Sequence, residues 1–364
     1  GNMVLDDDLY NALGPRTRKI WSVLSPKGLA EIDYRLIRHS PDQREKTLAM
    51  QLLDVEATYQ HFPYTLKNLK GNLLYAGDNI TVSEIFSQFD GSKVVINGEV
   101  TGCSTKRPVY GITVQADSIP LDSVLAEAFS ERQRYYYNQF DFSGLADAEI
   151  RIFTPQDWDS ATFEADVSLR QASLRVPVLQ QNVVSQQNPE NEAAEPQKSP
   201  LLVTGISAET VFSPGLMSVE KFAGEYGSGL VLVTGRISLQ REAEQPSYCL
   251  AVQGQQVELS EDFTAVIPPA LGNIFSKLQP KGKINFNADL KKGGLDDCPD
   301  YRVIVDCQND SVNFDDFPYP LRDITGRITI AENSLLLDGV AAAVADDIQI
   351  ASDTSSIELN GQVM

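Results

Sequence analysis

The chain has 364 residues, of which 42% are hydrophobic, and it carries a formal net charge of −20 at pH 7. This length can hold two ordinary domains or three smaller modules that depend on one another. The acidity argues against nucleic acid as a partner, because phosphate binding needs basic stripes. It also argues against adhesion to an anionic bilayer through basic residues. No apolar run approaches the ~20 residues of a membrane-spanning helix, so we expect membrane contact only through parts outside this fragment.

One block of sequence occurs three times and predicts two short helices followed by a glycine. It spans residues 5–28, 121–144 and 259–282 without an internal gap, at offsets of 116 (121 − 5) and 138 (259 − 121) residues. Repetition on this scale is typical of stacked modules that bury a shared core. The apolar positions that match in character are Leu9/Leu125/Phe263, Leu13/Phe129/Ile267, Ile20/Tyr136/Ile274, Trp21/Tyr137/Phe275 and Leu24/Phe140/Leu278.

The first copy of the block opens on three consecutive aspartates, Asp6 to Asp8. A calcium site is one interpretation of this acidic run. Asp122 and Ser260 take the equivalent place in the other copies, and Asp and Ser are favoured N-cap residues that satisfy free amides at a helix start. We therefore predict that these residues cap helices.

After its glycine, each copy alternates apolar and polar residues. The alternation covers residues 29–36, 145–152 and 283–290. Successive side chains of a strand point to opposite faces, so this pattern predicts a strand with one dry face and one wet face. Such strands are typical of antiparallel sheets that have one solvated side.

A Phe-Pro-Tyr corner follows in the first and third copies, within residues 61–73 and 316–328. Proline interrupts strand pairing and favours a corner. The middle copy lacks this motif. It has instead a stretch at about residues 180–200 that is rich in Gln, Asn, Glu, Pro and Ser, and we predict a mobile surface insert there.

Further apolar segments that contain or end at a glycine complete each copy, as at residues 94–100 and 231–237. We predict repeat one at residues 1–118, repeat two at 119–256 and repeat three at 257–364, the last truncated at its C-terminal end. The fold class is mainly β with short helices (α+β). It comprises three tandem repeats of curved antiparallel sheet plus two short helices, forming a trough or an elongated array. We also expect the chain to be a fragment of a longer array, with Gly1 a cloning remnant.

The residues that usually carry catalysis are sparse. The only histidines of the sequence, His39 and His61, fall in expected turns, and no nucleophile elbow, phosphate loop or dinucleotide motif occurs. No Cys or His spacing suggests zinc. Cys298 and Cys307 flank an expected hairpin, and pairing between them in an oxidising compartment stays open. We predict a protein that is not an enzyme and that has no cofactor or metal.

These elements together resemble the repeated segments of AsmA-like proteins of bacterial envelopes, the group that includes TamB and YhdP. That group in turn resembles the repeating β-groove lipid transfer proteins of eukaryotes. The resemblance rests on the paired short helices, on Pro-Lys-Gly at residues 26–28 and 280–282, on the alternating strand and on the Phe-Pro-Tyr corner. It covers nearly the whole chain except the insert.

The resemblance implies a trough lined by apolar side chains, along which acyl chains move across the periplasm, in a protein anchored in the inner membrane. It implies no catalytic residues. The partner would be a phospholipid or another lipid, and other envelope proteins are further candidates. Uncovered apolar sheet surface points the same way, since it usually meets a ligand or a partner. The residues we expect to line the groove are Ile32, Tyr34, Leu36, Leu73, Ile150, Ile152, Phe286, Ala288, Ile328 and Ile330.

An alternative function is a non-enzymatic structural or protein-interaction module of the cell envelope. In that case the sheets would close on themselves, and the same apolar residues would face the helices as ordinary core. A polysaccharide-processing enzyme is a weaker alternative, because it would need a cluster of carboxylates on matching strands, and the polar strand positions carry both signs of charge at Glu31, Asp33 and Arg35.

Overall fold

The structure is a computed structural model. It describes residues 1–40, 44–176, 201–239, 247–260, 262–263, 279–293, 302–314, 317–331, 334–344 and 356–363. Over these residues the chain forms eighteen strands and four helices, so the prediction of a mainly β fold with short helices is confirmed. The predicted insert at about residues 180–200 and Cys298 both lie outside the described residues.

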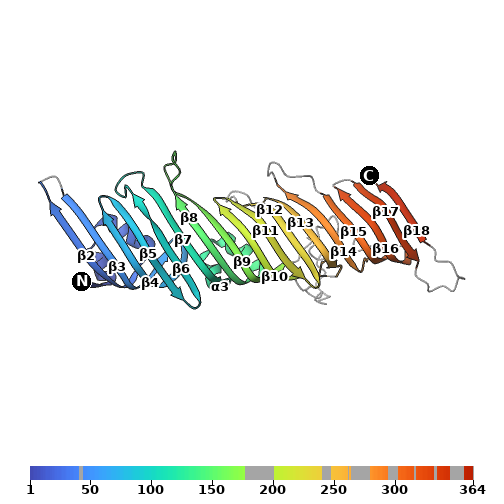
Figure 1. Cartoon of the computed structure of the whole chain (residues 1–364), viewed down its shortest axis with the longest axis horizontal. Coiled ribbons are helices and arrows are strands. Elements are labelled where there is room, and N and C mark those ends of the chain that lie inside the picture. The colour runs from blue at the N-terminus through green and yellow to red at the C-terminus, as the bar shows by residue number, and fades with distance from the viewer. Residues whose placement is uncertain are drawn as a thin grey trace, which may run out of the picture. The chain divides into compact units, whose positions relative to one another are not determined.

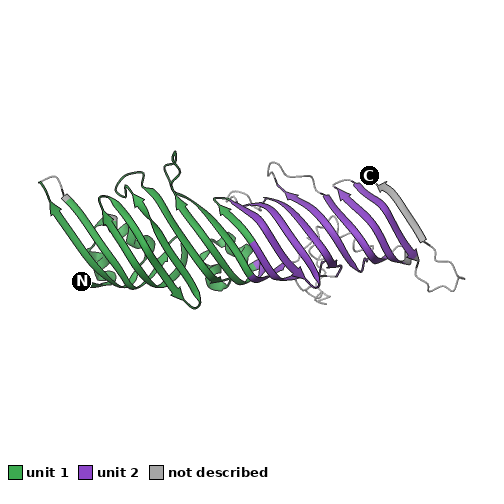
Figure 2. Ribbon diagram, in the orientation of Figure 1, with its two compact units in different colours: residues 1–138, 142–170, 209–215 green, residues 139–141, 171–208, 216–364 purple. Residues whose placement is uncertain are grey.

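The chain divides into two compact units, drawn in separate colours in Figure 2. Unit 1 comprises residues 1–138, 142–170 and 209–215, and unit 2 comprises the remainder. The elements in chain order are labelled in Figure 1 where there is room. They are β1 (Asn2–Leu5), α1 (Asp7–Ala12), α2 (Pro15–Leu24), β2 (Lys27–Arg38), β3 (Arg44–Tyr59), β4 (Phe62–Ala76), β5 (Asn79–Phe89), β6 (Ser92–Thr101), β7 (Val109–Pro120), α3 (Ser123–Ala128), α4 (Glu131–Phe140), β8 (Ser143–Phe153), β9 (Thr162–Val176), β10 (Leu201–Ser213), β11 (Leu216–Tyr226), β12 (Gly229–Ser238), β13 (Ser247–Glu258), β14 (Lys283–Lys292), β15 (Arg302–Phe314), β16 (Phe317–Ala331), β17 (Ser334–Val344) and β18 (Ser356–Val363).

Within each unit, neighbouring strands are consecutive in the sequence and antiparallel. In unit 1 this pairing runs from β1 to β8. In unit 2 it runs from β11 to β18. Antiparallel neighbours need only a short connection, as between β3 and β4, whereas the helix pairs α1–α2 and α3–α4 lie between β1 and β2 and between β7 and β8.

Side-chain caps start α1 and α3 as predicted. The Asp6 side chain accepts a hydrogen bond from the Leu9 amide, and the Asp122 side chain accepts one from the Leu125 amide, both at 3.0 Å. In the third copy the Ser260 hydroxyl accepts from the Phe263 amide at 3.1 Å. Each contact satisfies an amide that the first helical turn leaves unpaired. The three aspartates at the start of the chain therefore include a helix cap, and the cap prediction is confirmed.

The alternating segments also form strands as predicted, within β2, β8 and β14. The turn before each of these strands has the same backbone feature in all three copies. The residue three positions before the glycine that ends the repeated block is left-handed. This residue is Ser25, Asp141 or Gln279, with φ of 42°, 44° and 41°. The three copies of the block thus share the backbone conformation of this turn as well as a pattern of apolar residues.

The Phe-Pro-Tyr motif opens a strand. β4 begins at Phe62 directly after a two-residue turn, and β16 begins at Phe317. The pairing of β3 with β4 shifts at Tyr59, and Pro63 falls in the gap between the paired residues Phe62 and Thr65. Proline has no amide to donate, so an interruption in the ladder accommodates it.

The join from one repeat to the next is built the same way in both places. Ser118 near the end of β7 and Gln256 near the end of β13 are left-handed, with φ of 57° and 52°. Each donates its amide at 2.8 Å to a side chain of the next strand, Asp147 for Ser118 and Asn285 for Gln256. The last strand of repeat one and the last strand of repeat two therefore both have a left-handed residue at an equivalent position near their ends.

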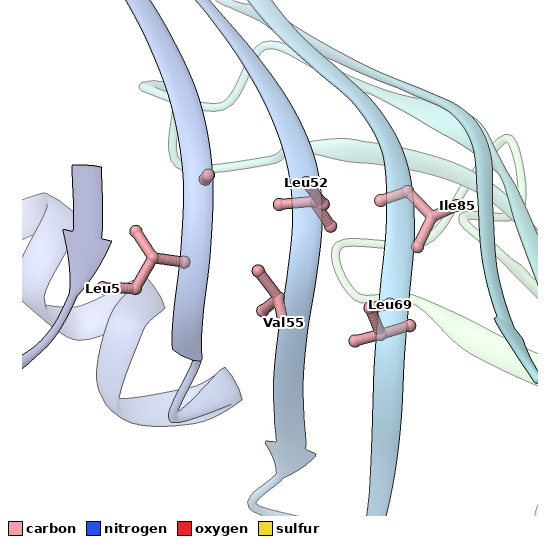
Figure 3. Packing of buried hydrophobic residues seen from close by; sticks show 6 residues of the cluster. Leu5, Leu52, Val55, Leu69 and Ile85 are labelled. Carbon is pink, nitrogen blue, oxygen red and sulfur yellow. The ribbon is translucent and has the colours of Figure 1, made fainter. Parts of the chain in front are cut away.

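The core of unit 1 lies between the strands and the helices, which lie on one side of the strands in Figure 1. Figure 3 shows part of it, where buried side chains from β1, β3, β4 and β5 gather. Leu9 of α1 and Trp21 of α2 pack against this cluster, and Leu125 of α3 packs against a second one. The residues of the first cluster are Leu5, Ala30, Leu52, Val55, Leu69 and Ile85.

Candidate functional site

Strand pairing puts the predicted lining residues of unit 1 on one face. Residues directly opposite each other in an antiparallel pair lie on the same face of a sheet, and so do alternate residues of one strand. Ile32, Leu73 and Ile152 fall in one cross-strand row, and Ile150 falls in the row beside it. Tyr34 and Leu36 follow Ile32 at alternate positions of β2. The first row reads Ile32, Met50, Leu73, Val82, Gly98, Ile112 and Ile152.

The predicted residues of unit 2 share a face in the same manner. Phe286 lies opposite Val305, and Val305 lies opposite Ile328. The next row joins Ala288, Val303 and Ile330. Ala288 and Val303 are buried, and Phe286, Leu290 and Ile330 pack against them. Ala288 therefore belongs to a packed cluster, whereas its larger neighbours are partly exposed.

Exposure along this face is uneven in unit 1. Ala30, at the end of β2 where the helices pack, is completely buried. Ile32 is partly buried against the same cluster. Tyr34 and Leu36, farther along the strand, are 56% and 51% exposed. The helices cover one end of the apolar face, which we call the covered end, and they leave the Tyr34–Leu36 end, which we call the open end.

The open end includes residues that the sequence patterns did not single out. Tyr34 is opposite Leu48, and the row continues through Tyr75, Ile80, Val100 and Tyr110. Of these, Val100 is buried, and the others are partly or largely exposed. The alternation of apolar and polar residues within each strand could have indicated which face these residues lie on. It could not have indicated which of them lie opposite one another, because bulges change the register between two strands.

The opposite face of unit 1 is polar and contains ion pairs. Arg151 of β8 lies 3.0 Å from both Glu164 and Asp166 of β9. Large apolar side chains occur there singly, such as Ile37 and Leu74 at 41% and 42% exposure. A hollow of about 410 Å³ also lies on this face. Residues lining it include Gln51, Lys70, Asn72, Glu84 and Phe86, which offer charges of both signs.

Few titratable groups have a strongly altered environment. Burial, followed by the charge of Asp310 and Asp306, raises the pKa of the free thiol Cys307 to about 11. Burial raises the pKa of Asp310, which is 2% exposed. Its Oδ1 has no hydrogen-bond partner among the described residues, whereas Oδ2 accepts from the Gln308 amide at 2.9 Å. Burial and the nearby Asp122 raise the pKa of Tyr137 to about 12.

The two histidines lie in turns, as the sequence predicts. His39 Nε2 is 3.1 Å from a carboxylate oxygen of Glu45, and both side chains are about half exposed. His61 is exposed, with its ring edge-on to Tyr59. Within the described ranges, His, Cys, Asp and Glu form no group of three or more that could hold a metal ion. The candidate site is therefore a surface of apolar side chains.

Comparisons with known proteins do not extend this description: no family model, no curated protein and no solved structure matches the chain. Among the helices that the structure describes, none has the length and hydrophobicity to span a bilayer.

Proposed function

We propose that the chain is a segment of a cell-envelope protein of lipid transport or outer-membrane biogenesis, and that the apolar face shields lipid acyl chains. The observation that carries the proposal is the exposure of the open end. Tyr34 and Leu36 share a face with buried Ala30 and Leu52, yet more than half of each side chain is exposed. Apolar surface of this kind, continuous with a core, is typical of a surface that a ligand or partner covers.

Acyl chains suit such a face for energetic reasons. Each methylene group removed from water contributes about 0.8 kcal/mol, so a chain gains affinity roughly in proportion to the length it buries. The row through Ile32, Met50 and Leu73 offers hydrocarbon and a thioether, and it offers no side-chain hydrogen-bond donor to fix a chain in one position. The face would therefore hold tails by burial and allow them to slide.

The periplasm is the compartment we propose, with the protein anchored in the inner membrane through parts outside this chain. This part of the proposal rests on the resemblance to AsmA-like repeats and not on the apolar face itself. The face would serve a structural or protein-interaction module of the envelope if a protein covered it. The experiment below separates these two functions.

The test is to purify the chain from bacterial cells, extract it with organic solvent and identify lipids by mass spectrometry, with the bound stoichiometry measured by native mass spectrometry. The variant Tyr34→Asp/Leu36→Asp puts two charges on the open end. We expect the wild type to carry phospholipid. The variant should lose at least about tenfold in bound lipid, which corresponds to about 1.4 kcal/mol.

A matched control places two charges on the other face of the sheet, one on β2 and one on β4. Ile37→Asp/Leu74→Asp replaces two side chains of similar exposure, and it should keep the lipid. Circular dichroism checks that all three proteins fold. Lipid-free wild type, or equal lipid in the two variants, would overturn the proposal and favour the structural module.

A further inference from the structure

We propose that the outer edge of β2 binds an extended segment of a partner protein, which joins the sheet as a further antiparallel strand, and that this segment has the residue pattern of β7. The proposal does not rest on the acyl-chain function above. Three features support it: backbone groups of β2 that point away from the sheet, the pairing of the equivalent strands β8 and β14, and the exposure of apolar side chains along the edge.

β2, the outermost of the long strands of unit 1 in Figure 1, has two neighbours over only part of its length. β1 pairs with it as far as Glu31, and Gly1 exchanges two backbone hydrogen bonds with Ile32. The amides of alternate residues point to opposite edges, so Tyr34 and Leu36 direct theirs to the same side as Ile32, away from β3. Within the described part of the chain no strand pairs with these two residues on that side, and such an edge is a template for a further strand.

The equivalent strands of the other two repeats are paired along this edge. Met3 of β1 lies opposite Ala30. Ile119 of β7, 116 residues later (119 − 3), lies opposite Ala146, so β1 corresponds to the end of β7. β7 then continues along β8 to Gly111, and β13 continues in the same way along β14. The repeats therefore show which kind of segment fits the outer edge of β2.

The hydrogen bonds between β7 and β8 use the corresponding side of the strand. The Thr154 amide, directly after β8, donates to the Tyr110 carbonyl oxygen at 3.1 Å, so the even-numbered residues of β8 direct their backbone groups to β7. One of them, Ile150, lies opposite Val114 and corresponds to Tyr34 at the offset of 116 residues. A segment like β7 on the edge of β2 would therefore place its valine opposite Tyr34 and pair with the outward backbone groups there.

Apolar side chains along this edge are more exposed than their equivalents beside a neighbouring strand. Tyr34 and Leu36 are 56% and 51% exposed. Ile150 and Ile152, which correspond to them and have β7 beside them, are partly buried. An added strand would cover apolar surface of β2 as β7 covers that of β8. The burial of that surface would add to the affinity that the backbone hydrogen bonds provide.

The polar residues of the edge indicate the composition of the partner segment. Asp33 of β2 corresponds to Glu149 of β8, and the Gln115 side-chain amide of β7 donates to the Glu149 carboxylate at 3.4 Å. Thr113 of β7 lies opposite a basic residue of β8, to which Arg35 corresponds. Like charges directly opposite each other are destabilising, so uncharged residues suit an edge with both signs of charge. The segment should therefore alternate apolar residues with uncharged ones. The intervening residues of β13 are also uncharged: Cys249, Ala251 and Gln253.

The experiment uses a fluorescent synthetic peptide with the sequence of residues 109–117, titrated into the full chain while the fluorescence anisotropy is measured. We expect saturable binding. Methylation of the peptide nitrogen at Val114, which would face β2, removes a hydrogen-bond donor and should weaken binding at least about tenfold. The matched control carries the same methyl group at Thr113, whose amide would face away from β2, and it should keep most of the affinity.

Tyr34→Pro tests the same hydrogen bond from the side of the protein. Proline has no amide hydrogen and is tolerated on an edge strand where that amide would face solvent, so the variant should fold and lose the peptide. Circular dichroism checks the fold, and the two methylated peptides decide the question if the variant does not fold. No binding of the unmodified peptide, or equal binding of the two methylated ones, would overturn the proposal. A dimer in sedimentation that Tyr34→Pro dissociates would also overturn it, because a second copy of the chain would then occupy the edge.

Discussion

The two ends of one apolar face in unit 1 differ in what covers them. At the covered end, Ala30, Leu52 and Val55 are buried beneath side chains of α1 and α2. At the open end, Tyr34 and Leu36 continue the same alternation but remain more than half exposed. The same residue pattern thus produces core at one end and accessible surface at the other. The lesson is that alternation assigns a residue to a face, and the neighbouring element decides whether that face is core.

Element lengths explain the difference. α2 has 10 residues and is therefore about 15 Å long, at about 1.5 Å per residue. β2 has 12 residues and β3 has 16, which at about 3.4 Å per residue extend over about 40 Å and 54 Å. Such a short helix cannot cover strands of this length even when it lies along them. The uncovered stretch follows from the short helical segment between Pro15 and Gly28.

The largest expected contrast comes from truncating one leucine at each end. Leu52→Ala removes a side chain that is 7% exposed and leaves a cavity, which typically costs about 2–5 kcal/mol. Leu36→Ala removes a side chain that is about half exposed, and it should change the free energy of unfolding by less than about 1 kcal/mol. Urea denaturation of both variants measures the difference. Equal costs would mean that the open end is core as well.

A smaller contrast is expected between two glycines. At the covered end Gly28 has φ of 129°, and a Cβ there would lie 2.2 Å from the Asp54 carbonyl oxygen. At the open end Gly77 has φ of 57°, and nothing lies within 4 Å of its added Cβ. Gly28→Ala should cost about 1–3 kcal/mol or more. Gly77→Ala should cost about 1 kcal/mol, because only the left-handed backbone is penalised. Thermal melting of the two variants checks the order.

The smallest contrast concerns the third repeat, where an acidic residue occupies a buried position. The backbone of Asp310 approaches Gly282 as that of Val55 approaches Gly28, so the two residues correspond. Burial raises the pKa of Asp310, which means that the native state disfavours the ionised form. Asp310→Asn should therefore stabilise the protein at pH 7, by on the order of 1 kcal/mol.

The pH dependence of this variant gives a direct check. In the unfolded chain the Asp310 carboxyl has an ordinary pKa near 3.8. In the native state its pKa is higher, so it takes up a proton at a higher pH than in the unfolded chain. The wild type should therefore gain stability relative to Asp310→Asn as the pH falls from 7 through the raised pKa, and the gap should close near pH 4. Melting curves across this range test it. A gap that widened toward acid would show that the native carboxylate is stabilised.

The sequence predicted the parts of the fold that depend on local chemistry. Asp6 caps a helix because its side chain reaches the amide three residues on, and β2 alternates because its two faces meet different surroundings. The cross-strand row that contains Tyr34, Tyr75 and Tyr110 could not be predicted the same way. Its register depends on bulges, such as the shift between Leu52 and Val55, that no local pattern marks. Nor does alternation distinguish exposed Leu36 from buried Ala288.

The matching joins at Ser118 and Gln256 bear on how such a chain could change length in evolution. A recombination between the coding segments at these two points would delete or duplicate one complete repeat. Because both residues are left-handed and both donate an amide to the following strand, the new junction would have the local geometry of the old ones. Side chains of the apolar face would stay on that face. The span of the protein could thus grow or shrink by whole repeats, without an intermediate of broken register.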